Sequence, residues 1–321
     1  MPRPFPFIPA AFFGMPLGLL ALGNAWRAAD AVWPMAAAIG ELVMFAGILI
    51  WTTYLGLFAA KLMLRPDDAR AERDHPVQFA FLSLIGITAV LVGSALLPYV
   101  RPVGSLFFMA GAFFLLGYAV HATAKLWLGE RDPALSLPML HIPAASAAFT
   151  VAGNAALFGW EGLGRLVFGL GMLSWFAIEA LVLQRLLTGP RLAAEQRPLL
   201  GVQLAPPTVG GVAALAVFGP AALPIAAALL GYALFQALVL LRMAPWIAAN
   251  GFAPTWWAFS FGAAALGTLP LRILAQSPSP LIEGLALLLF VAANLVVGAL
   301  VILTIRSFVG ATPRAAAPEL S

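Results

Sequence analysis

The 321-residue sequence contains no cysteine, and only 9% of its residues are charged. The absence of cysteine excludes disulfide bonds, thiolate metal ligands and cysteine nucleophiles. The scarcity of charge leaves too little polar surface to cover a water-soluble globule, because 62% of the residues are hydrophobic and the mean hydropathy is +0.98. These values predict an integral membrane protein.

Acidic residues are fewer than basic ones, 13 against 17, and the isoelectric point is near 10. The basic residues fall between apolar blocks and form no continuous basic face that could follow a phosphate backbone. We therefore expect no nucleic-acid partner, and we interpret the positive charge as a signal of membrane topology.

Long apolar blocks dominate the sequence, and about 20 apolar residues in a helix cross the hydrocarbon core of a bilayer. Strand-like alternation is absent, which favours an all-α fold over a transmembrane barrel. The first block is long and lacks a convincing cleavage site, so we assign it as a span. The chain, 1–321, is predicted to form one transmembrane domain with ten spans, at approximately 8–28, 34–60, 77–98, 104–127, 136–157, 163–186, 199–218, 222–243, 253–273 and 281–306.

The positions of the lysines and arginines test this count, because cytoplasmic loops carry an excess of these residues. With ten spans, thirteen of them fall on the side of the N-terminus. The other side has only four, which are Arg27, Arg101, Arg165 and Arg272. This asymmetry predicts an even number of spans near ten, with both termini in the cytoplasm.

The odd-numbered spans carry glycine, proline, serine or threonine at mid-depth, unlike the even-numbered ones. They recur at intervals of about 55 to 70 residues, as five helical hairpins would, and five similar hairpins suggest a quasi-five-fold ring. The polar segments are FGMPLG (13–18), FLSLIGIT (81–88), LPMLHIPAA (137–145), LAPPTVGG (204–211) and FSFGAAALGT (259–268).

Proline in a transmembrane helix frees backbone carbonyls, which are tolerated only inside protein or beside a watery cavity. The pattern therefore predicts that the odd-numbered helices line a central pore. The alternative interpretation is that glycine and proline serve close helix packing. The candidate pore-lining or kinking residues are Gly14, Pro16, Gly18, Pro143, Pro206, Pro207 and Gly262.

Ionisable residues are rare inside the spans, and the odd-numbered spans contain no carboxylate. A coupled porter needs acidic groups near the midplane and a cation channel favours an acidic ring, so the predicted pore is expected to admit anions. Glu179 in the sixth span and His141 in the fifth are candidate sensor or relay residues. Pairing with a neighbouring helix is the alternative explanation for both.

No motif indicates catalysis or a bound cofactor. The sequence has no HExxH motif and no serine-nucleophile motif. His121 and His141 lie singly in different spans, which makes a poor haem or metal site. We expect no enzyme activity, no catalytic residue, no metal and no cofactor.

Phe261, in the ninth span, is the candidate gate. Phe259 and Phe261 are two residues apart in WWAFSFGAAALG (256–267), so on a helix they point to nearly opposite faces. A bulky ring among small residues can occlude a narrow pore, and the adjacent Gly262 can ease a helix adjustment. Phe259 is the second candidate. The face of Phe261 continues through Ala258, Ala264, Ala265 and Thr268.

Six segments, spread over nearly the whole chain, carry a family resemblance. They are FFGMPLGLLALGNAWR (12–27), HPVQFAFLSLIGITAVLVG (75–93), GMLSWFAIEALVLQRLL (171–187), RPLLGVQLAPP (197–207), GYALFQALVLLRMAPW (231–246) and WWAFSFGAAALGT (256–268). Together they resemble the tellurite-resistance/dicarboxylate transporter (TehA) family, which is related to the slow-type anion channels of plants.

The resemblance implies ten helices arranged as five hairpins, with an inner ring of the odd-numbered helices. It also implies a homotrimer with one pore in each subunit, in a bacterial inner membrane. The gate phenylalanine of the family corresponds to Phe261, or to Phe259 if the other face lines the pore. The first-helix glycine of the family corresponds to Gly14.

The kinking prolines of the family correspond to Pro16, Pro143 and one of the pair 206–207. The third span departs from this pattern, because its only proline is Pro98 at its outer end. A kink in the third span is therefore not expected from a proline.

Two functions remain open from the sequence. The first is a passive, gated anion channel for chloride- or nitrate-like ions. The second is a secondary carrier for C4-dicarboxylates or tellurite-type oxyanions, as the names of the family imply. The expected partners are small inorganic or carboxylate anions, membrane lipid and two further copies of the chain.

Overall fold

The computed structural model describes residues 8–34, 37–129 and 131–309, and in these ranges the chain forms helices and no strand. The α-helices are α1 (Gly14–Asp30), α2 (Ala37–Leu64), α3 (Pro66–Asp74), α4 (Ser83–Leu96), α5 (Arg101–Trp127), α6 (Ala147–Leu157), α7 (Glu161–Thr188), α8 (Ala205–Phe218), α9 (Leu223–Ala248), α10 (Ala258–Leu274) and α11 (Pro280–Val309). Every predicted span overlaps one of these helices, and α3 lies between the second and third predicted spans.

Seven helical segments of the described residues are long and apolar enough to cross a membrane. One of them, 194–248, contains both α8 and α9, which are separated at Gly219 with a φ of 60°. The helices α1 and α6 are not among the seven. The all-helical prediction is confirmed, and ten membrane crossings stay a prediction.

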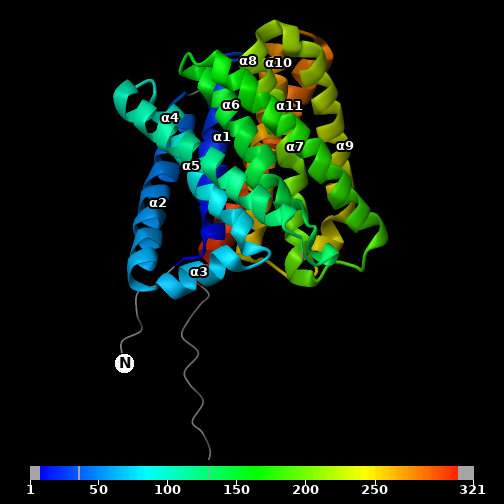
Figure 1. Cartoon of the computed structure of the whole chain (residues 1–321). Coiled ribbons are helices and arrows are strands. Elements are labelled where there is room, and N and C mark those ends of the chain that lie inside the picture. Colours follow the sequence, from blue (N-terminus) through cyan, green and yellow to red (C-terminus); the bar gives the residue numbers. More distant parts are fainter. Residues whose placement is uncertain (1–7, 35–36, 130, 310–321) are drawn as a thin grey trace, which may run out of the picture.

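Two groups of helices differ in burial. We call α1, α4, α6, α8 and α10 the inner helices, because most of their residues are buried. We call α2, α5, α7, α9 and α11 the outer helices, because they expose large apolar side chains, such as Leu42 (68%), Phe113 (84%) and Leu166 (77%). Each inner helix packs against the outer helix that follows it in the chain. Each inner helix also contacts the next inner helix, and α10 contacts α1 (Figure 1).

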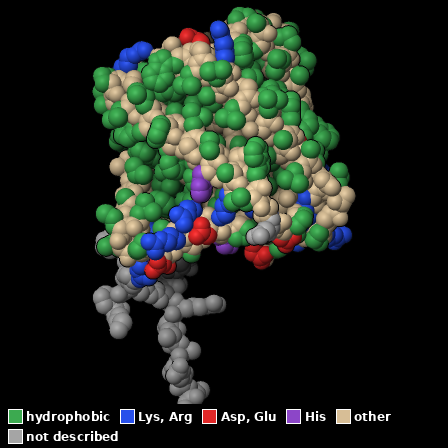
Figure 2. Space-filling view, viewed as in Figure 1, with side chains coloured by type: hydrophobic (Ala, Val, Ile, Leu, Met, Phe, Trp, Pro, Cys, Tyr) green, Lys and Arg blue, Asp and Glu red, His purple; other side chains and the backbone are tan. Residues whose placement is uncertain are grey.

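The surface of the outer helices is apolar along the length of the bundle. Figure 2 shows hydrophobic side chains covering the middle of the visible face, with lysine, arginine, aspartate and glutamate gathered at the two ends. Exposed apolar surface on this scale would be costly in water and is the expected surface of a bilayer-embedded bundle. The chain is a multi-pass membrane protein.

Glycine allows the closest approach between α4 and α5. A Cβ atom added at Gly93 would lie 2.7 Å from the carbonyl oxygen of Gly104, and a Cβ at Gly104 would lie 2.7 Å from that of Gly93. Any larger side chain at either position would therefore push the two helices apart. Small residues are the usual means by which membrane helices pack, since lipid supplies no hydrophobic driving force between them.

The inner helices share an irregular start. Four of them continue directly from 3₁₀ turns. In such turns the hydrogen bonds join residues i and i+3, and the backbone is wound more tightly than in an α-helix. α6 follows a 3₁₀ turn and then a π turn that contains Pro143. The preceding elements are η1 (Ala10–Phe13), η2 (Gln78–Leu82), η4 (Pro138–His141), η5 (Ile142–Ser146), η6 (Ala194–Leu204) and η8 (Pro254–Trp257). Two other short turns, η3 (Pro133–Leu135) and η7 (Gly219–Ala222), lie in connections.

The short helix α3 lies across the lower edge of the bundle in Figure 1. Pro66 occupies its first turn with Asp67 and Asp68, which suits a helix start because proline has a preset φ and carboxylates favour the positive end of the helix dipole. Its buried Glu72 carboxylate pairs with the ammonium of Lys61, which is also buried and belongs to α2. This pair fixes α3 against the end of α2.

Candidate functional site

Two cavities lie inside the bundle, and the ring of Phe261 borders both of them. The larger cavity has a volume of about 240 Å³ and is lined by α1, α4, α6, α8 and α10 together with Gln276. The smaller cavity has a volume of about 40 Å³ and is lined by the beginnings of α1, α4, α8 and α10 and by the irregular turns that precede the five inner helices. Both cavities therefore lie among the inner helices, with Phe261 between them.

One face of α10 runs along the larger cavity. Phe261, Ala265, Thr268 and Arg272 all line it, and their spacing of four, three and four residues places them on one side of a helix. Ala258, one turn before Phe261, lines the smaller cavity. This is the face that the sequence predicts for the gate residue.

Phe259 lies on another face of α10 and lines neither of these cavities. Its ring stacks on Trp256 with a centroid distance of 5.7 Å. A Cβ atom added at Gly201 would lie 2.6 Å from the Cγ atom of Phe259, so the ring packs directly on η6. Of the two candidate gate residues, Phe261 therefore lines both cavities and Phe259 lines neither.

The other candidate residues mostly lie in contacts between helices. Gly14 lines the smaller cavity and faces Trp257, whose Cβ would lie 3.2 Å from a Cβ at Gly14. Gly18 faces Ser260 of α10 in the same way, and Gly262 faces Leu204. These glycines let α1 and η6 approach α10 closely.

The candidate prolines are buried and line neither cavity. Pro16 lies in the first turn of α1, Pro143 in the π turn η5, and Pro206 and Pro207 in the first turn of α8. α4 begins in the same irregular way as the other inner helices although no proline lies at its start. The irregular start is therefore shared by all five inner helices and does not require proline.

Charge at the two cavities is of one sign. Arg272 is the charged residue among those that line them, and no carboxylate of the described chain lines either cavity. Hydroxyl groups line both, from Thr150 and Thr268 in the larger cavity and from Ser146 and Thr255 in the smaller one. The hydroxyls of Thr150 and Thr268 already donate to the carbonyl oxygens of Ser146 and Ala264. The guanidinium of Arg272 is therefore the group of the larger cavity that favours anions over cations.

Glu179 and His141, which the sequence singled out separately, lie together. The Oε2 atom of Glu179 is 3.0 Å from the Nε2 atom of His141. The Tyr232 hydroxyl donates to Oε1 of Glu179 at 2.5 Å, and the Gln236 amide donates to the Tyr232 oxygen at 2.8 Å. Tyr232 and Gln236 were not among the residues predicted from the sequence. Their spacing of four residues in an otherwise apolar stretch of α9 was the available signal.

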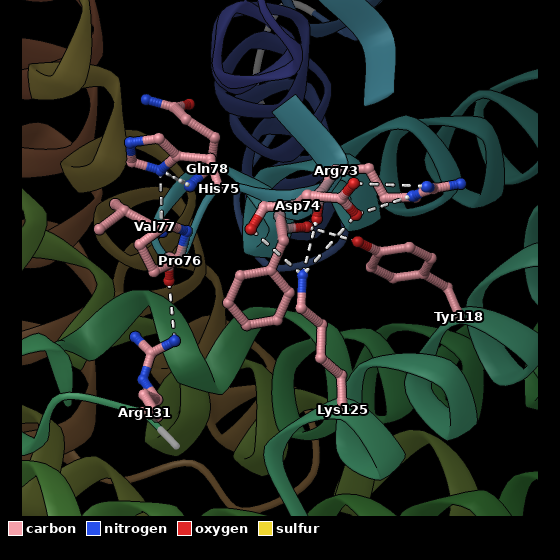
Figure 3. A network of polar contacts seen from close by, with 10 residues as sticks. Arg73, Asp74, His75, Pro76, Val77, Gln78, Tyr118, Lys125 and Arg131 are labelled. Carbon is pink, nitrogen blue, oxygen red and sulfur yellow. Dashed lines mark hydrogen bonds and ion pairs between the residues drawn. The ribbon is translucent and has the colours of Figure 1, made fainter. Parts of the chain in front are cut away.

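A polar network holds the segment before α4 at the lower end of the bundle (Figure 3). The ammonium of Lys125 donates to the carbonyl oxygens of Arg73 at 3.2 Å and Asp74 at 3.3 Å. The guanidinium of Arg131 donates to the carbonyl oxygen of Pro76 at 2.8 Å. The network ties the α3–η2 connection to α5 and to the connection that follows α5.

The same network fixes η2, which carries a lining residue of the smaller cavity. The Tyr118 hydroxyl donates to the carbonyl oxygen of Phe79 at 2.7 Å, and Phe81 lines the cavity two residues later. The hydrogen bond from the Arg73 guanidinium holds the pKa of the Asp74 carboxyl below its usual range. Asp74 therefore stays ionised and adds a negative charge near Lys125.

Comparison with known proteins decides the family. The family model of the SLAC1 voltage-dependent anion channels matches residues 8–305. The chain belongs to this family. A protein of Haemophilus influenzae, named a tellurite resistance protein TehA homolog, is 33% identical over 304 residues, which cover 94% of this chain and 91% of that protein.

Membership of the voltage-dependent anion channel family confirms the resemblance noted in the sequence. It indicates anion transport as the function and anions as the substrates, and the family is one of transport proteins. The matched range contains both cavities and all five inner helices.

Proposed function

We propose that this chain is a passive, gated anion channel in which the ring of Phe261 plugs a pathway through the inner helices. The observation that carries the proposal is that Phe261 lines both the larger and the smaller cavity. The ring is almost fully buried, with 9% of its surface exposed, so it fills the space between the cavities. A change in the rotamer of this ring would join the two cavities.

The lining of the cavities supports selectivity for anions such as chloride and nitrate. The smaller cavity exceeds the roughly 10–15 Å³ that a water molecule needs, so it has room for a small ion. The hydroxyl oxygens of Ser146 and Thr255 have no hydrogen-bond partner within the described ranges. A hydroxyl can donate its proton to an anion, and a weak site of this kind suits rapid passage.

The proposed architecture is a single transmembrane domain of ten crossings, arranged as five helical hairpins. The inner helices form a quasi-five-fold ring around the pathway. The contacts support this arrangement, because each inner helix packs on the outer helix after it and on the next inner helix, and α10 contacts α1.

The proposed location is a bacterial inner membrane, with both termini in the cytoplasm. The thirteen-to-four distribution of lysine and arginine supports this orientation. The end of the bundle that carries α3 would then face the cytoplasm, and the larger cavity would face the other side. Family resemblance supports a homotrimer in which each subunit has its own pathway.

A second candidate function is a secondary carrier for C4-dicarboxylates or tellurite-type oxyanions. The name of the Haemophilus influenzae relative, a tellurite resistance protein, favours it. The buried pair of His141 and Glu179 would then supply the coupling group. Neither residue lines the cavities beside Phe261, which favours the channel.

The test is a recording of chloride and nitrate conductance in planar bilayers, with the purified wild type beside Phe261→Ala. The variant is expected to conduct at least about tenfold more, which corresponds to a barrier about 1.4 kcal/mol lower. The matched control is Phe259→Ala, which removes the same ring from the same helix at a position packed on Gly201. Its conductance is expected to stay near that of the wild type.

Two results would contradict the channel. A folded Phe261→Ala protein that conducts no more than the wild type would remove Phe261 from the gate. If all variants are silent while liposomes accumulate a dicarboxylate under a proton gradient, the carrier is the function. Glu179→Gln would then be expected to abolish that uptake.

A further inference from the structure

Arg272 is a cavity-lining arginine without an acidic partner. It lies in the last turn of α10, is exposed, and lines the larger cavity. None of the ion pairs formed by the described residues involves Arg272. A charged side chain within a membrane bundle is costly, and one without a partner that faces a cavity marks a functional site.

Two less exposed arginines, Arg27 and Arg185, have hydrogen-bond partners. Both guanidinium edges of Arg27 are engaged, with Glu41 at 2.7 and 2.8 Å and with the carbonyl oxygen of Ala95 at 3.0 Å. Arg185 donates to the carbonyl oxygen of Ala134 at 2.7 Å. These arginines hold helices together, whereas the donors of Arg272 are available to a ligand.

Arg272 and Phe261 lie at the two ends of one helical face. They are eleven residues apart, which is about 16 Å along a helix axis. The larger cavity extends over this distance, and its volume of about 240 Å³ leaves room for a small anion with several waters. Beyond Arg272, the cavity reaches the exposed residue Gln276 after the end of α10. An ion that approaches Phe261 through the larger cavity therefore passes Arg272.

Three amide side chains surround the same cavity. Asn24 of α1, Asn154 of α6 and Gln276 all line it together with Arg272. The Asn154 amide group donates to the carbonyl oxygen of Thr150 at 2.7 Å, and that of Gln276 donates to the carbonyl oxygen of Arg272 at 3.4 Å. Amide and guanidinium groups are the donors that oxyanions bind in proteins.

We infer that Arg272, with Asn24, Asn154 and Gln276, forms a binding site that captures small oxyanions at the end of the larger cavity remote from Phe261. The planar guanidinium presents two parallel N–H donors, which match the two oxygens of a carboxylate, nitrate or similar group. A halide has no second acceptor atom for this fork. The inference rests on the proposed function, since it names the preferred substrate class of the same pathway.

The conductance test uses the Phe261→Ala background, with Arg272→Gln and Arg272→Lys added separately. Arg272→Gln is expected to lower nitrate conductance at 0.1 M salt by about threefold to tenfold, because a positive potential at a pore mouth raises the local anion concentration. The ratio of nitrate to chloride permeability, taken from bi-ionic reversal potentials, is expected to fall as well. Arg272→Lys should restore conductance through its charge but not the nitrate preference, because it lacks the planar fork.

The matched control is Arg165→Gln, which removes an exposed arginine from the same predicted side of the membrane without touching either cavity. It is expected to leave both the conductance and the permeability ratio unchanged. An equal loss of conductance in Arg165→Gln and Arg272→Gln would mean that general surface charge causes the effect. That result would overturn the site.

A second measurement does not depend on conduction. Nitrate at 100 mM, compared with chloride at the same ionic strength, is expected to raise the thermal midpoint of the detergent-purified wild type, since a ligand that binds the folded state stabilises it. Arg272→Gln should lose this difference. If Phe261→Ala is silent but nitrate protection depends on Arg272, the channel fails and the oxyanion site stands.

The remaining outcomes also decide the inference. If Phe261→Ala conducts and Arg272→Gln changes neither the permeability ratio nor the nitrate protection, the channel stands and the oxyanion site is overturned. If Phe261→Ala does not conduct and nitrate raises the thermal midpoint of neither the wild type nor any variant, the channel and the oxyanion site both fail.

Discussion

The Nε2 atom of His141 lies 3.0 Å from the Oε2 atom of Glu179. The other carboxylate oxygen of Glu179 accepts a hydrogen bond from Tyr232 at 2.5 Å. The three residues come from η4, α7 and α9, and both His141 and Glu179 are buried. One carboxylate therefore joins three elements beside the inner helices. A buried polar group of this kind is costly when any of its partners is removed.

Glu179→Ala is expected to lower the free energy of unfolding by about 1–3 kcal/mol, because it leaves the Tyr232 hydroxyl and the His141 imidazole without their partner. Glu179→Gln keeps the side-chain length and an acceptor oxygen, so its loss should be smaller. Thermal unfolding in detergent, followed by circular dichroism, measures both. In the Phe261→Ala background, Glu179→Gln should leave the anion current intact.

The control for this prediction is Glu283→Ala, which removes an exposed glutamate from the first turn of α11. Its thermal midpoint should stay close to that of the wild type. An equal loss of stability in Glu179→Ala and Glu283→Ala would show that the buried cluster contributes nothing specific. Loss of the anion current in Glu179→Gln would instead favour the carrier.

Gly18→Ala is expected to destabilise the contact between α1 and α10. A Cβ atom at this position would lie 2.4 Å from the Cβ atom of Ser260, which is itself buried and hydrogen-bonded to the carbonyl oxygen of Gly14 at 3.2 Å. One of the helices must shift, and overpacking of this kind costs about 1–3 kcal/mol. The thermal midpoint of the purified protein measures the loss.

Gly284→Ala is the matched control for the change at Gly18. Gly284 lies in α11, and a Cβ atom there would meet no other heavy atom within 4 Å. Alanine is the better helix former, so Gly284→Ala should be neutral or slightly stabilising. If the thermal midpoint of Gly18→Ala equals that of the wild type, α1 and α10 do not approach each other closely at this position.

The α3–η2 connection is expected to loosen under acid conditions. The pKa of Asp74 is lowered because Arg73 hydrogen-bonds to its carboxylate. A lowered pKa in the folded protein means that the stabilisation is present above the unfolded pKa and is lost as the pH falls through the folded value. Amide exchange over residues 75–78 should therefore become faster below about pH 4.

Asp74→Asn supplies the reference for this exchange measurement, because it cannot change its ionisation. The variant is expected to lack the acceleration of exchange that protonation of Asp74 causes over residues 75–78 in the wild type. If the wild type and Asp74→Asn show the same pH profile, the Arg73–Asp74 pair does not restrain the connection.

Most helix positions follow from the sequence, because a run of about 20 apolar residues has few alternatives to a membrane helix. The helix α3 was not predicted. Its sequence, PDDARAERD (66–74), contains no apolar run, and isolated helices of this length are marginal in water. Pro66 followed by Asp67 and Asp68 was the local signal, but the buried pairing of Glu72 depends on a residue of α2.

The irregular starts of the inner helices were foreseen only in part. Pro143 and Pro206 marked two of them, yet Ser83 begins α4 after a 3₁₀ turn that contains no proline. The choice between 3₁₀ and α hydrogen bonding there depends on packing by other helices, which periodicity does not report.

The residues of the candidate site were also predictable only in part. The face of Phe261 was predictable, since it depends on the 3.6-residue period of one helix. The approach of His141 to Glu179 was not, because it depends on how η4 and α7 pack together.

Lys61→Met is expected to be strongly destabilising, because it leaves the Glu72 carboxylate buried without its cation. Removing one partner of a buried ion pair costs about 3–5 kcal/mol. Glu72 also accepts a hydrogen bond from the backbone N–H of Ala10 at 2.6 Å, so the loss of stability should extend to η1, before α1.

The double variant Lys61→Met/Glu72→Gln should recover much of the lost thermal midpoint, since no buried charge remains. Arg70→Met, which breaks an exposed pair with Asp67, should change the midpoint little. If the double variant is no more stable than Lys61→Met, the cost does not arise from an unpaired carboxylate, and Lys61 stabilises α2 through packing on Phe58 instead.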